Sequence, residues 1–477
     1  YMENYDETKE SSYLMYFDVN SLYSWAMCNP LPIGGFKWVD VKDKNGYMKT
    51  KAYNKEYNFI VECDIEYPDN LHDLHNDYPL APEKIIIDDF VKMSPYRKNL
   101  IDKFNKEHDV KIRKSKVPKL ISSFLPKKNY VVHAKLLKYY SQLGLKINIT
   151  KILTFKEKPW MKEFIEFNIK KRTLAKNDFE VDFFKLMNNS VYGKTMENVR
   201  KRCRFTVVNS EEKALKHIAH PSFKNIIKIN DNFLIINKLK NEVTLNKPFY
   251  VGVAILDYSK LLMYKYHYGL FKKIYNDKIR LILTDTDSLF YEIKTDDVYK
   301  DLFGKDENGK YKQVKEFFGK KLVNVKDFFD TSNFKKDSIY FSDKHKKENG
   351  LIKPENGDNI ISRVCSNKSK VYAFEYAEEY FKFLTDQDKS KLVRCKGTNK
   401  TTVKNEITIN KLIDTIKENT LTKNDNYCFR SKKHNLGLYK INKVSLSCYD
   451  DKRHILEDGI TSYAHGHYKV KDYVSKL

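Results

Sequence analysis

Two aspartates, Asp285 and Asp287, are separated by a single residue inside the strand-like stretch RLILTDTDSLFYEI. Because apolar and aromatic residues favour strands while Asp, Thr and Ser favour turns, the pattern predicts a β-hairpin over residues 280–293. A tight polar turn is enough to explain the two acids. Alternatively, two carboxylates held beside a buried sheet are relieved by a proton or by a cation, and Mg²⁺ takes hard oxygen ligands. The hairpin alone leaves both interpretations open.

A third acid, Asp18, ends another predicted strand, residues 13–17, in the stretch YLMYFDVNSLYSWAMCNPLP. Asn20 or Ser21 can then cap a short helix that stops before Pro30. An acid at the C-terminal end of a strand is well placed to face a cleft, which makes Asp18 a candidate site residue. The alternative is that Asp18 is itself the N-cap of that helix.

The stretch FFKLMNNSVYGKTMEN predicts one face of a helix that begins near Asp178. On it Lys185, Asn189 and Tyr192 are spaced i, i+4 and i+7 and share a face, and Gly193 leaves room beside the ring. A cation, an amide, an aromatic ring and a bare backbone together match the needs of a nucleotide. The alternative is an ordinary amphipathic helix with a solvated lysine.

Composition limits the classes of function. The chain has 477 residues, 41% of them hydrophobic, which is enough for two to four subdomains. Lys and Arg outnumber Asp and Glu by 88 to 63, for a net charge of +25. That excess favours a polyanionic partner, nucleic acid first, unless it reflects a Lys-rich composition spread along the whole chain. Seven cysteines without a C-x-x-C pair indicate reduced thiols in an intracellular protein.

No signal peptide or membrane span is visible in the sequence, so we expect no membrane partner. The chain begins at Tyr1, with a motif-bearing strand within twenty residues, and we expect it to be a fragment of a longer protein.

Together the three segments resemble motifs A, B and C of family B DNA polymerases, as DVNSLY (18–23), KLMNNSVYG (185–193) and DTDS (285–288), in the family's order. The stretches KPFYVGVAILDYSKLLMY, KVYAFEY and YDDKRHILEDGITSYAHGH are similar to the protein-primed branch, in particular to Maverick/Polinton elements and related viruses. The resemblance implies an α+β right-hand polymerase with palm, fingers and thumb, an antiparallel palm sheet and terminal-protein-region insertions on either side of the fingers motif.

The resemblance also implies a subdomain order. The expected segments are a first palm segment (1–35), a first terminal-protein-region-like insertion (36–150), fingers (151–198), a second such insertion (199–245), a second palm segment (246–345), and the thumb with the C-terminal region (346–477).

Roles carry over from the resemblance residue by residue. Asp18 and Asp287 are expected to hold two Mg²⁺ ions, or Mn²⁺, with the backbone oxygen of Val19 as a further ligand and Asp285 as the supporting acid. The expected nucleotide-binding residues are Tyr23, Arg172, Lys185, Asn189, Tyr192 and Gly193, and the expected DNA-binding residues are Lys370, Tyr372 and Lys396.

The implied function is a DNA-directed DNA polymerase that adds dNTPs to a primer 3′-hydroxyl by two-metal phosphoryl transfer. Primer-template DNA is its expected partner, and a terminal protein is a candidate primer. We expect a monomer in the nucleus or at a viral replication site.

Departures from the family keep alternatives open. Ser24 replaces the usual proline, RVCSNKSKVY lacks the glycine and leucine common before the K-x-Y lysine, and no exonuclease motif precedes Asp18, so we expect no proofreading site. The alternatives are an inactive, truncated polymerase that still binds nucleic acid, a reverse transcriptase and a two-metal nuclease. A reverse transcriptase would pair adjacent aspartates in its motif C, and a nuclease has no need of the face around Lys185.

Overall fold

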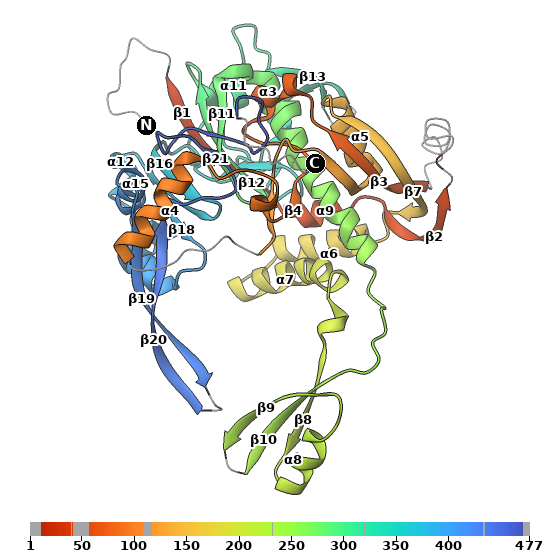
Figure 1. The fold of residues 1–477 in the computed structure, drawn as a ribbon. Coiled ribbons are helices and arrows are strands. Elements are labelled where there is room, and N and C mark those ends of the chain that lie inside the picture. The colour runs from red at the N-terminus through yellow and green to blue at the C-terminus, as the bar shows by residue number, and fades with distance from the viewer. Residues whose placement is uncertain are drawn as a thin grey trace.

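The computed structural model of the chain describes residues 11–39, 41, 57–108, 117–230, 232–317, 320–432 and 435–470. It is a mixed α and β structure, as expected, in which seven-stranded and four-stranded antiparallel sheets flank a long central helix (Figure 1).

The seven-stranded sheet joins segments that are far apart in sequence. Its strands run in the order β11-β12-β1-β16-β17-β18, with β15 also paired to β1, and every pair is antiparallel. The strands are β1 (Ser12–Val19), β11 (Ile279–Thr284), β12 (Ser288–Lys294), β15 (Ile352–Pro354), β16 (Ile361–Lys368), β17 (Val371–Tyr376) and β18 (Val393–Cys395). The predicted hairpin over residues 280–293 is confirmed as β11 and β12. Residues 352–395, which we grouped with the thumb, supply four strands to the sheet that carries the hairpin.

One continuous helical segment packs against this sheet and also contacts helices outside it. It consists of α9 (Phe249–Tyr264), a π-helical stretch η5 (Lys265–Phe271) and α10 (Lys272–Tyr275). The ring of Phe17 in β1 lies 4.9 Å from that of Phe271. α9 also contacts α1 (Leu22–Met27), α5 (Ala134–Gln142) and α7 (Asp178–Thr195). Since α9 is apolar nearly all round and most of it is buried, it acts as the common core element.

The four-stranded sheet has the order β2-β7-β3-β6. Its strands are β2 (Leu31–Val39), β3 (Tyr57–Glu66), β6 (Lys127–His133) and β7 (Lys146–Lys158). Alternate residues of β3 are buried, as expected for a strand with one face against a core. β2 begins before residue 36 and β7 ends after residue 150, so two strands of this sheet cross the predicted limits of the first insertion.

The predicted helix near Asp178 is confirmed as α7. It begins after Asn177, whose side chain accepts a hydrogen bond from the Glu180 backbone at 2.9 Å. α6 (Lys162–Thr173) packs beside it, and the buried Asn168 amide donates to Asn188 at 2.9 Å.

Two smaller units extend from this body in Figure 1. One is the sheet β8-β10-β9 with its helix, formed by β8 (Cys203–Val208), α8 (Glu211–Ile218), β9 (Phe223–Asn230) and β10 (Phe233–Leu239). The other is the long hairpin of β19 (Leu421–Lys432) and β20 (Asn435–Ser447). α15 (Ile409–Lys417) contacts β20, while α13 (Asp386–Lys391) and α14 (Lys400–Glu406) contact β18.

The remaining elements are short, apart from α4. They are η2 (Asp69–Leu71), α3 (His72–His75), β4 (Glu83–Ile85), η3 (Ile87–Asp89), α4 (Pro95–His108), β5 (Lys119–Ile121), η4 (Val199–Lys201), η6 (Asn276–Lys278), α11 (Val298–Phe303), β13 (Gln313–Phe317), β14 (Lys320–Asn324), η7 (Val325–Phe328), α12 (Glu378–Phe381), β21 (His454–Ile455) and β22 (Ser462–Tyr463). No helix in the described part of the chain has both the length and the apolar composition that crossing a bilayer requires.

Buried histidines join the C-terminal residues to α3. The His72 ring stacks on Phe124 at 4.1 Å and accepts a hydrogen bond from the backbone of Tyr468. His75, which is 1% exposed, shares a hydrogen bond of 2.6 Å with Tyr67. These buried rings pack the segment around Tyr468 against α3 and Phe124.

We expect the fold to lose stability as pH falls. Burial, with His72 and Lys272 nearby, lowers the pKa of His75 to about 4. In the unfolded chain the pKa of a histidine is about 6.5, so the contribution of the buried neutral ring to the free energy of unfolding is fully present above that pH and is lost as pH falls toward 4. Between pH 7.5 and 5.5 the loss is about 1 kcal/mol for each histidine of this kind. Urea unfolding at the two pH values measures the loss.

His75→Gln should show a smaller acid loss than the wild type, because glutamine takes up no proton. His220→Gln, at an exposed position, is the matched control and should keep the full loss. An unchanged pH dependence in His75→Gln would contradict the prediction.

Candidate active site

Asp18 and Asp287 meet at one end of the seven-stranded sheet. Asp18 in β1 is paired with Ser288 in β12 and with Lys353 in β15. The backbone N–H of Val19 donates to the carbonyl of Asp287 at 2.8 Å. Because β1 and β12 are antiparallel, the end of β1 lies against the hairpin turn, and two acids 269 positions apart become neighbours.

The hairpin turn gives its two aspartates different surroundings. Thr286 has a left-handed backbone (φ 66°), and the Asp287 N–H donates to the Asp285 carbonyl at 2.8 Å. The Asp285 carboxylate is ion-paired with Lys370, which also approaches the Thr286 hydroxyl at 3.5 Å. Asp285 is therefore paired with a lysine, whereas the backbone carbonyl of Asp287 is bonded to β1.

The charges of Asp18 and Asp287 are destabilised. Burial raises the pKa of Asp18 to about 8, with further increases from Asp287 and Glu355 that Lys353 and Lys185 partly offset. Burial also raises the pKa of Asp287, with Asp285 adding to it and Lys370 and Lys185 opposing it. Two half-buried carboxylates that repel each other are a fitting site for a cation.

The donor set suits a hard divalent ion. Two carboxylates and a backbone carbonyl next to one of them, at Val19, are oxygen ligands of the kind that Mg²⁺ takes. Within the described residues there is no cluster of three or more His, Cys, Asp or Glu side chains that would hold a metal on its own. A metal held by Asp18 and Asp287 would thus keep positions open for substrate oxygens.

The helix face predicted from motif B lies beside the acids. The rings of Tyr23 in α1 and Tyr192 in α7 stack at 4.7 Å with 20° between their planes. Lys185 is exposed and interacts electrostatically with both Asp18 and Asp287. Asn189 is exposed on the same helix.

Gly193 and Arg172 complete the predicted nucleotide-binding set. A Cβ on Gly193 would meet no atom within 4 Å, so the space beside the backbone is open. Arg172 in α6 is half-buried, and burial lowers its pKa while Asp182 partly offsets the effect.

The three predicted DNA-binding residues lie together at the other side of the hairpin turn. Lys370 has a left-handed backbone (φ 63°) between β16 and β17, and its carbonyl accepts from the Lys396 N–H at 3.1 Å. The hydroxyls of Tyr372 and Tyr16 are 3.2 Å apart. The Tyr16 hydroxyl in turn donates to Ser288 at 3.4 Å, so hydroxyl groups link Tyr372 to the hairpin.

The structure confirms Ser21 at the N-cap position of the short helix but shows no capping bond from its side chain. α1 begins at Leu22, and Ser21 has a left-handed backbone (φ 47°). The Asn20 side chain instead donates to Asp330. The alternative that Asp18 caps the helix is also wrong, because Asp18 lies within β1.

Sequence reasoning missed the residues that β15 brings to the site. Lys353 is paired with Asp18, and Glu355 donates its backbone N–H to the Tyr16 carbonyl at 2.8 Å. The charge of Glu355 raises the pKa of Asp18, and the charge of Lys353 lowers it. No spacing in the sequence signals them, since they depend on how β15 pairs with β1.

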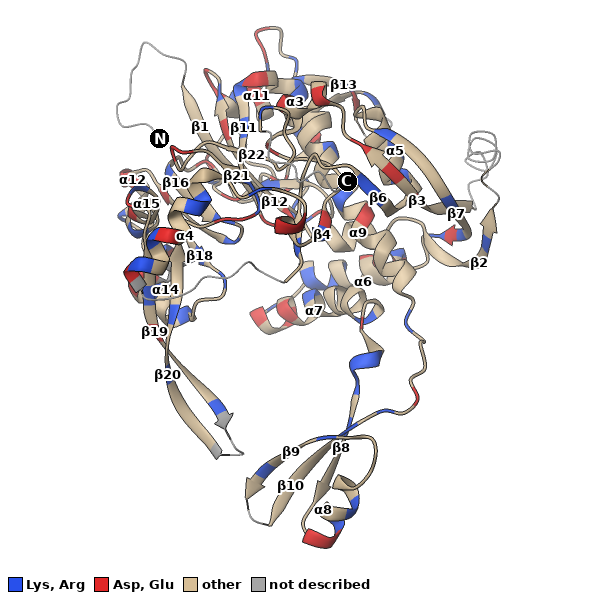
Figure 2. Ribbon diagram, in the orientation of Figure 1, with Lys and Arg blue, Asp and Glu red and all other residues tan. Residues whose placement is uncertain are grey.

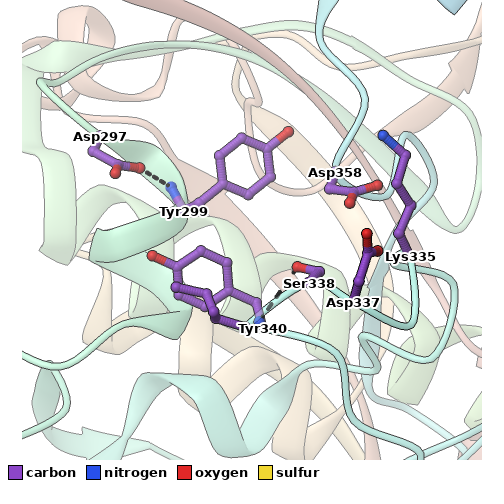
Figure 3. Close-up of a pocket in the computed structure, with 8 residues that line it drawn as sticks. Asp297, Tyr299, Lys335, Asp337, Ser338, Tyr340 and Asp358 are labelled. Atoms are coloured by element: carbon purple, nitrogen blue, oxygen red, sulfur yellow. Dashed lines mark hydrogen bonds between the residues drawn. The ribbon is translucent and has the colours of Figure 1, made fainter.

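A cavity of about 470 Å³ lies away from these residues, beside α11 and residues 335–340 (Figure 3). It is lined by Asp297, Tyr299, Lys335, Asp337, Ser338, Ile339, Tyr340 and Asp358. Because none of the predicted site residues lines it, it is separate from the site at the sheet end.

Comparisons with known proteins gave a family match and several similar structures. The model of a family described as DNA polymerase type B, organellar and viral, matches residues 3–269. No curated protein was found to match. Phi29 DNA polymerase complexed with primer-template DNA and incoming nucleotide substrates has a TM-score of 0.47 and 16% identity, covering 93% of this chain and 60% of that chain. The orthorhombic crystal form of Phi29 DNA polymerase has a TM-score of 0.46 and 15% identity, with the same coverage. This chain therefore spans about 60% of the length of those chains.

Proposed function

From the premise that this chain belongs to the organellar and viral type B DNA polymerases, we propose that it adds deoxynucleotides to the 3′-hydroxyl of a primer on a DNA template. The observation that carries the proposal is the meeting of Asp18 and Asp287 beside the helix face of Lys185. Its motifs favour a protein-primed replication system of the Maverick/Polinton type, in which a terminal protein supplies the primer. In this proposal the seven-stranded sheet is the palm and α6 and α7 belong to the fingers.

Asp18, Asp287 and the Val19 carbonyl would hold Mg²⁺ in this reaction. When bound, the metal supplies activation of the primer hydroxyl and neutralisation of charge on the departing pyrophosphate. The protein's part is to hold the two carboxylates side by side, which it does by fixing β1 against the hairpin turn, and a bound cation would favour their ionised form.

Charged and aromatic groups around the acids would orient the nucleotide. Lys185 and Arg172 are placed on α7 and α6 to bind the triphosphate. The stacked pair of Tyr23 and Tyr192 offers a flat apolar surface for the sugar and base. Stacking on Tyr192 would hold the ring of Tyr23 where it excludes a 2′-hydroxyl.

The DNA would lie beside the hairpin turn. Lys370, Tyr372 and Lys396 are grouped on one side of the turn, in the place proposed for the primer end. Figure 2 shows Lys and Arg distributed over most elements rather than gathered in one region. A net charge of +25 spread in this way favours many phosphate contacts that carry no sequence information.

Primer extension tests the proposal. The chain is incubated with a primed DNA template, Mg²⁺ and the four dNTPs, and we expect stepwise extension. A chain that binds the primer-template but never extends it would be the inactive, truncated polymerase. Shortening of the primer would indicate a nuclease, and preferential extension on an RNA template would indicate a reverse transcriptase.

Replacing Tyr23 with valine should relax the choice of sugar. The smaller side chain opens space beside Tyr192, so we expect ribonucleotide incorporation to rise about tenfold or more relative to dNTP incorporation. Single-nucleotide incorporation with matched dNTP and rNTP pairs measures the ratio. Tyr23→Phe keeps the ring and should keep the wild-type ratio. An unchanged ratio in Tyr23→Val would remove Tyr23 from this role.

A further inference from the structure

The turn that follows β1 is held by hydrogen bonds from another part of the chain. The Asn20 N–H donates to the Leu351 carbonyl at 2.8 Å, and the Asn20 carbonyl accepts from the Gly350 N–H at 2.8 Å. Asn20 stands directly after Val19 and three residues before Tyr23. Any shift of Asn20 would therefore move both a proposed metal ligand and the ring proposed to contact the sugar.

Asp330 fixes the side chain of Asn20. Asp330 is 1% exposed, and both of its carboxylate oxygens accept hydrogen bonds. One oxygen accepts from the Asn20 amide and from the Lys347 N–H, both at 2.8 Å. The other accepts from the Ser332 N–H at 3.0 Å.

These bonds keep the carboxylate ionised. Burial by itself would raise the pKa of Asp330, but the hydrogen bonds from Ser332, Lys347 and Asn20 lower it below the ordinary value. Hydrogen bonds to a charged acceptor are stronger and more directional than neutral ones. Asp330 is thus a rigid acceptor rather than a loose surface acid.

The same segment is locked onto the helix that carries Tyr23. Gly350 has a left-handed backbone (φ 79°), and a Cβ there would come within 2.2 Å of the Trp25 ring in α1. The Tyr266 hydroxyl donates to the Gly350 carbonyl at 2.5 Å. α1 therefore packs against Gly350, and the turn before α1 is hydrogen-bonded to Gly350 and Leu351.

We propose that Asp330 is a positioning residue for nucleotide incorporation, because its buried carboxylate fixes, through Asn20, the turn between the acid Asp18 and the ring of Tyr23. The inference rests on the proposed function and adds a residue that touches neither the metal ligands nor the nucleotide. It also reaches the phosphate side of the site, since Lys347, held by the same oxygen, interacts electrostatically with Arg172.

Asp330→Asn tests the inference, because the amide has nearly the same shape but carries no charge and presents a donor at the position of one of the two accepting oxygens. We expect the maximal single-turnover rate to fall about tenfold and ribonucleotide incorporation to rise about threefold relative to dNTP, with DNA affinity within about twofold of wild type. Asn20→Ala should reproduce these changes. The double variant should be no worse than either single one, because both remove one linkage.

Asp327→Asn, on the same stretch of chain, is the matched control and should behave as wild type. The inference is overturned if Asp330→Asn has the wild-type rate and sugar choice. It is also overturned if activity falls only in step with a lowered melting temperature while sugar choice is unchanged. Should Asp330→Asn fail to fold, Asn20→Ala decides by the same two criteria. A wild-type chain that extends no primer overturns the proposed function itself, and this inference with it.

Discussion

Alanine at Asp287 or at Asp18 is expected to lower primer extension about a thousandfold or more, equivalent to about 4 kcal/mol in the activation barrier. The two acids meet at the sheet end, and burial raises both pKa values, with Asp287 adding to that of Asp18 and Asp285 adding to that of Asp287. Removing either one takes away one of the two carboxylates proposed to hold the metal. Single-turnover extension at saturating dNTP and Mg²⁺ measures the loss.

DNA binding separates this effect from unfolding. Asp296→Ala, at an exposed acid after β12, is the matched control and should extend primers normally. Affinity for primer-template should change little in all three variants, because the many Lys and Arg residues supply it. Extension at a comparable rate by Asp18→Ala or Asp287→Ala would show that these acids do not hold the metal.

Local patterns in the sequence predicted the elements of the site well. Alternating strand formers around DTDS predicted the hairpin, and helical spacing predicted the face of α7 that carries Lys185 and Tyr192. Both signals are short-range, since a turn or a helix is decided largely by residues a few positions apart. The resemblance of the three motifs added that these elements belong to one site.

Contacts between residues far apart in the sequence could not be predicted from the sequence pattern. The ion pair of Asp285 with Lys370 depends on where β17 lies beside the hairpin, and the position of Lys353 beside Asp18 depends on the register of β15. Strand register is set by tertiary packing, and a slip of one residue in β15 would place a different residue beside Asp18. The same reason explains Asn20, which was predicted as a helix cap but is bound to an acid 310 positions away.

The division into subdomains is harder to predict for a related reason. β2 and β7 pair within one sheet although the expected limits at residues 35 and 150 cut through them. Motif spacing marks the centres of elements, whereas the ends of a sheet depend on which strands find partners. The names palm, fingers and thumb therefore stay predictions for the segments.

Replacing Lys185 with alanine should weaken apparent dNTP affinity about tenfold or more, since a charge-assisted contact with a phosphate contributes roughly 1.5 to 3 kcal/mol. Lys185 is exposed on α7, interacts with both acids, and lies on the helix whose Tyr192 stacks on Tyr23. Because the charge on the phosphates shifts during transfer, the chemical step should slow as well.

Single-turnover incorporation against dNTP concentration, beside a DNA titration at fixed salt, distinguishes the roles open to Lys185. Lys194→Ala is the matched control, because Lys194 is exposed on the same helix but pairs with Glu197 at 3.3 Å. One lysine among 88 basic residues contributes little to DNA affinity, so that affinity should hold in both variants. Loss of DNA affinity with a normal dNTP dependence would instead make Lys185 a template contact, and the face of α7 would then serve the nucleic acid rather than the triphosphate.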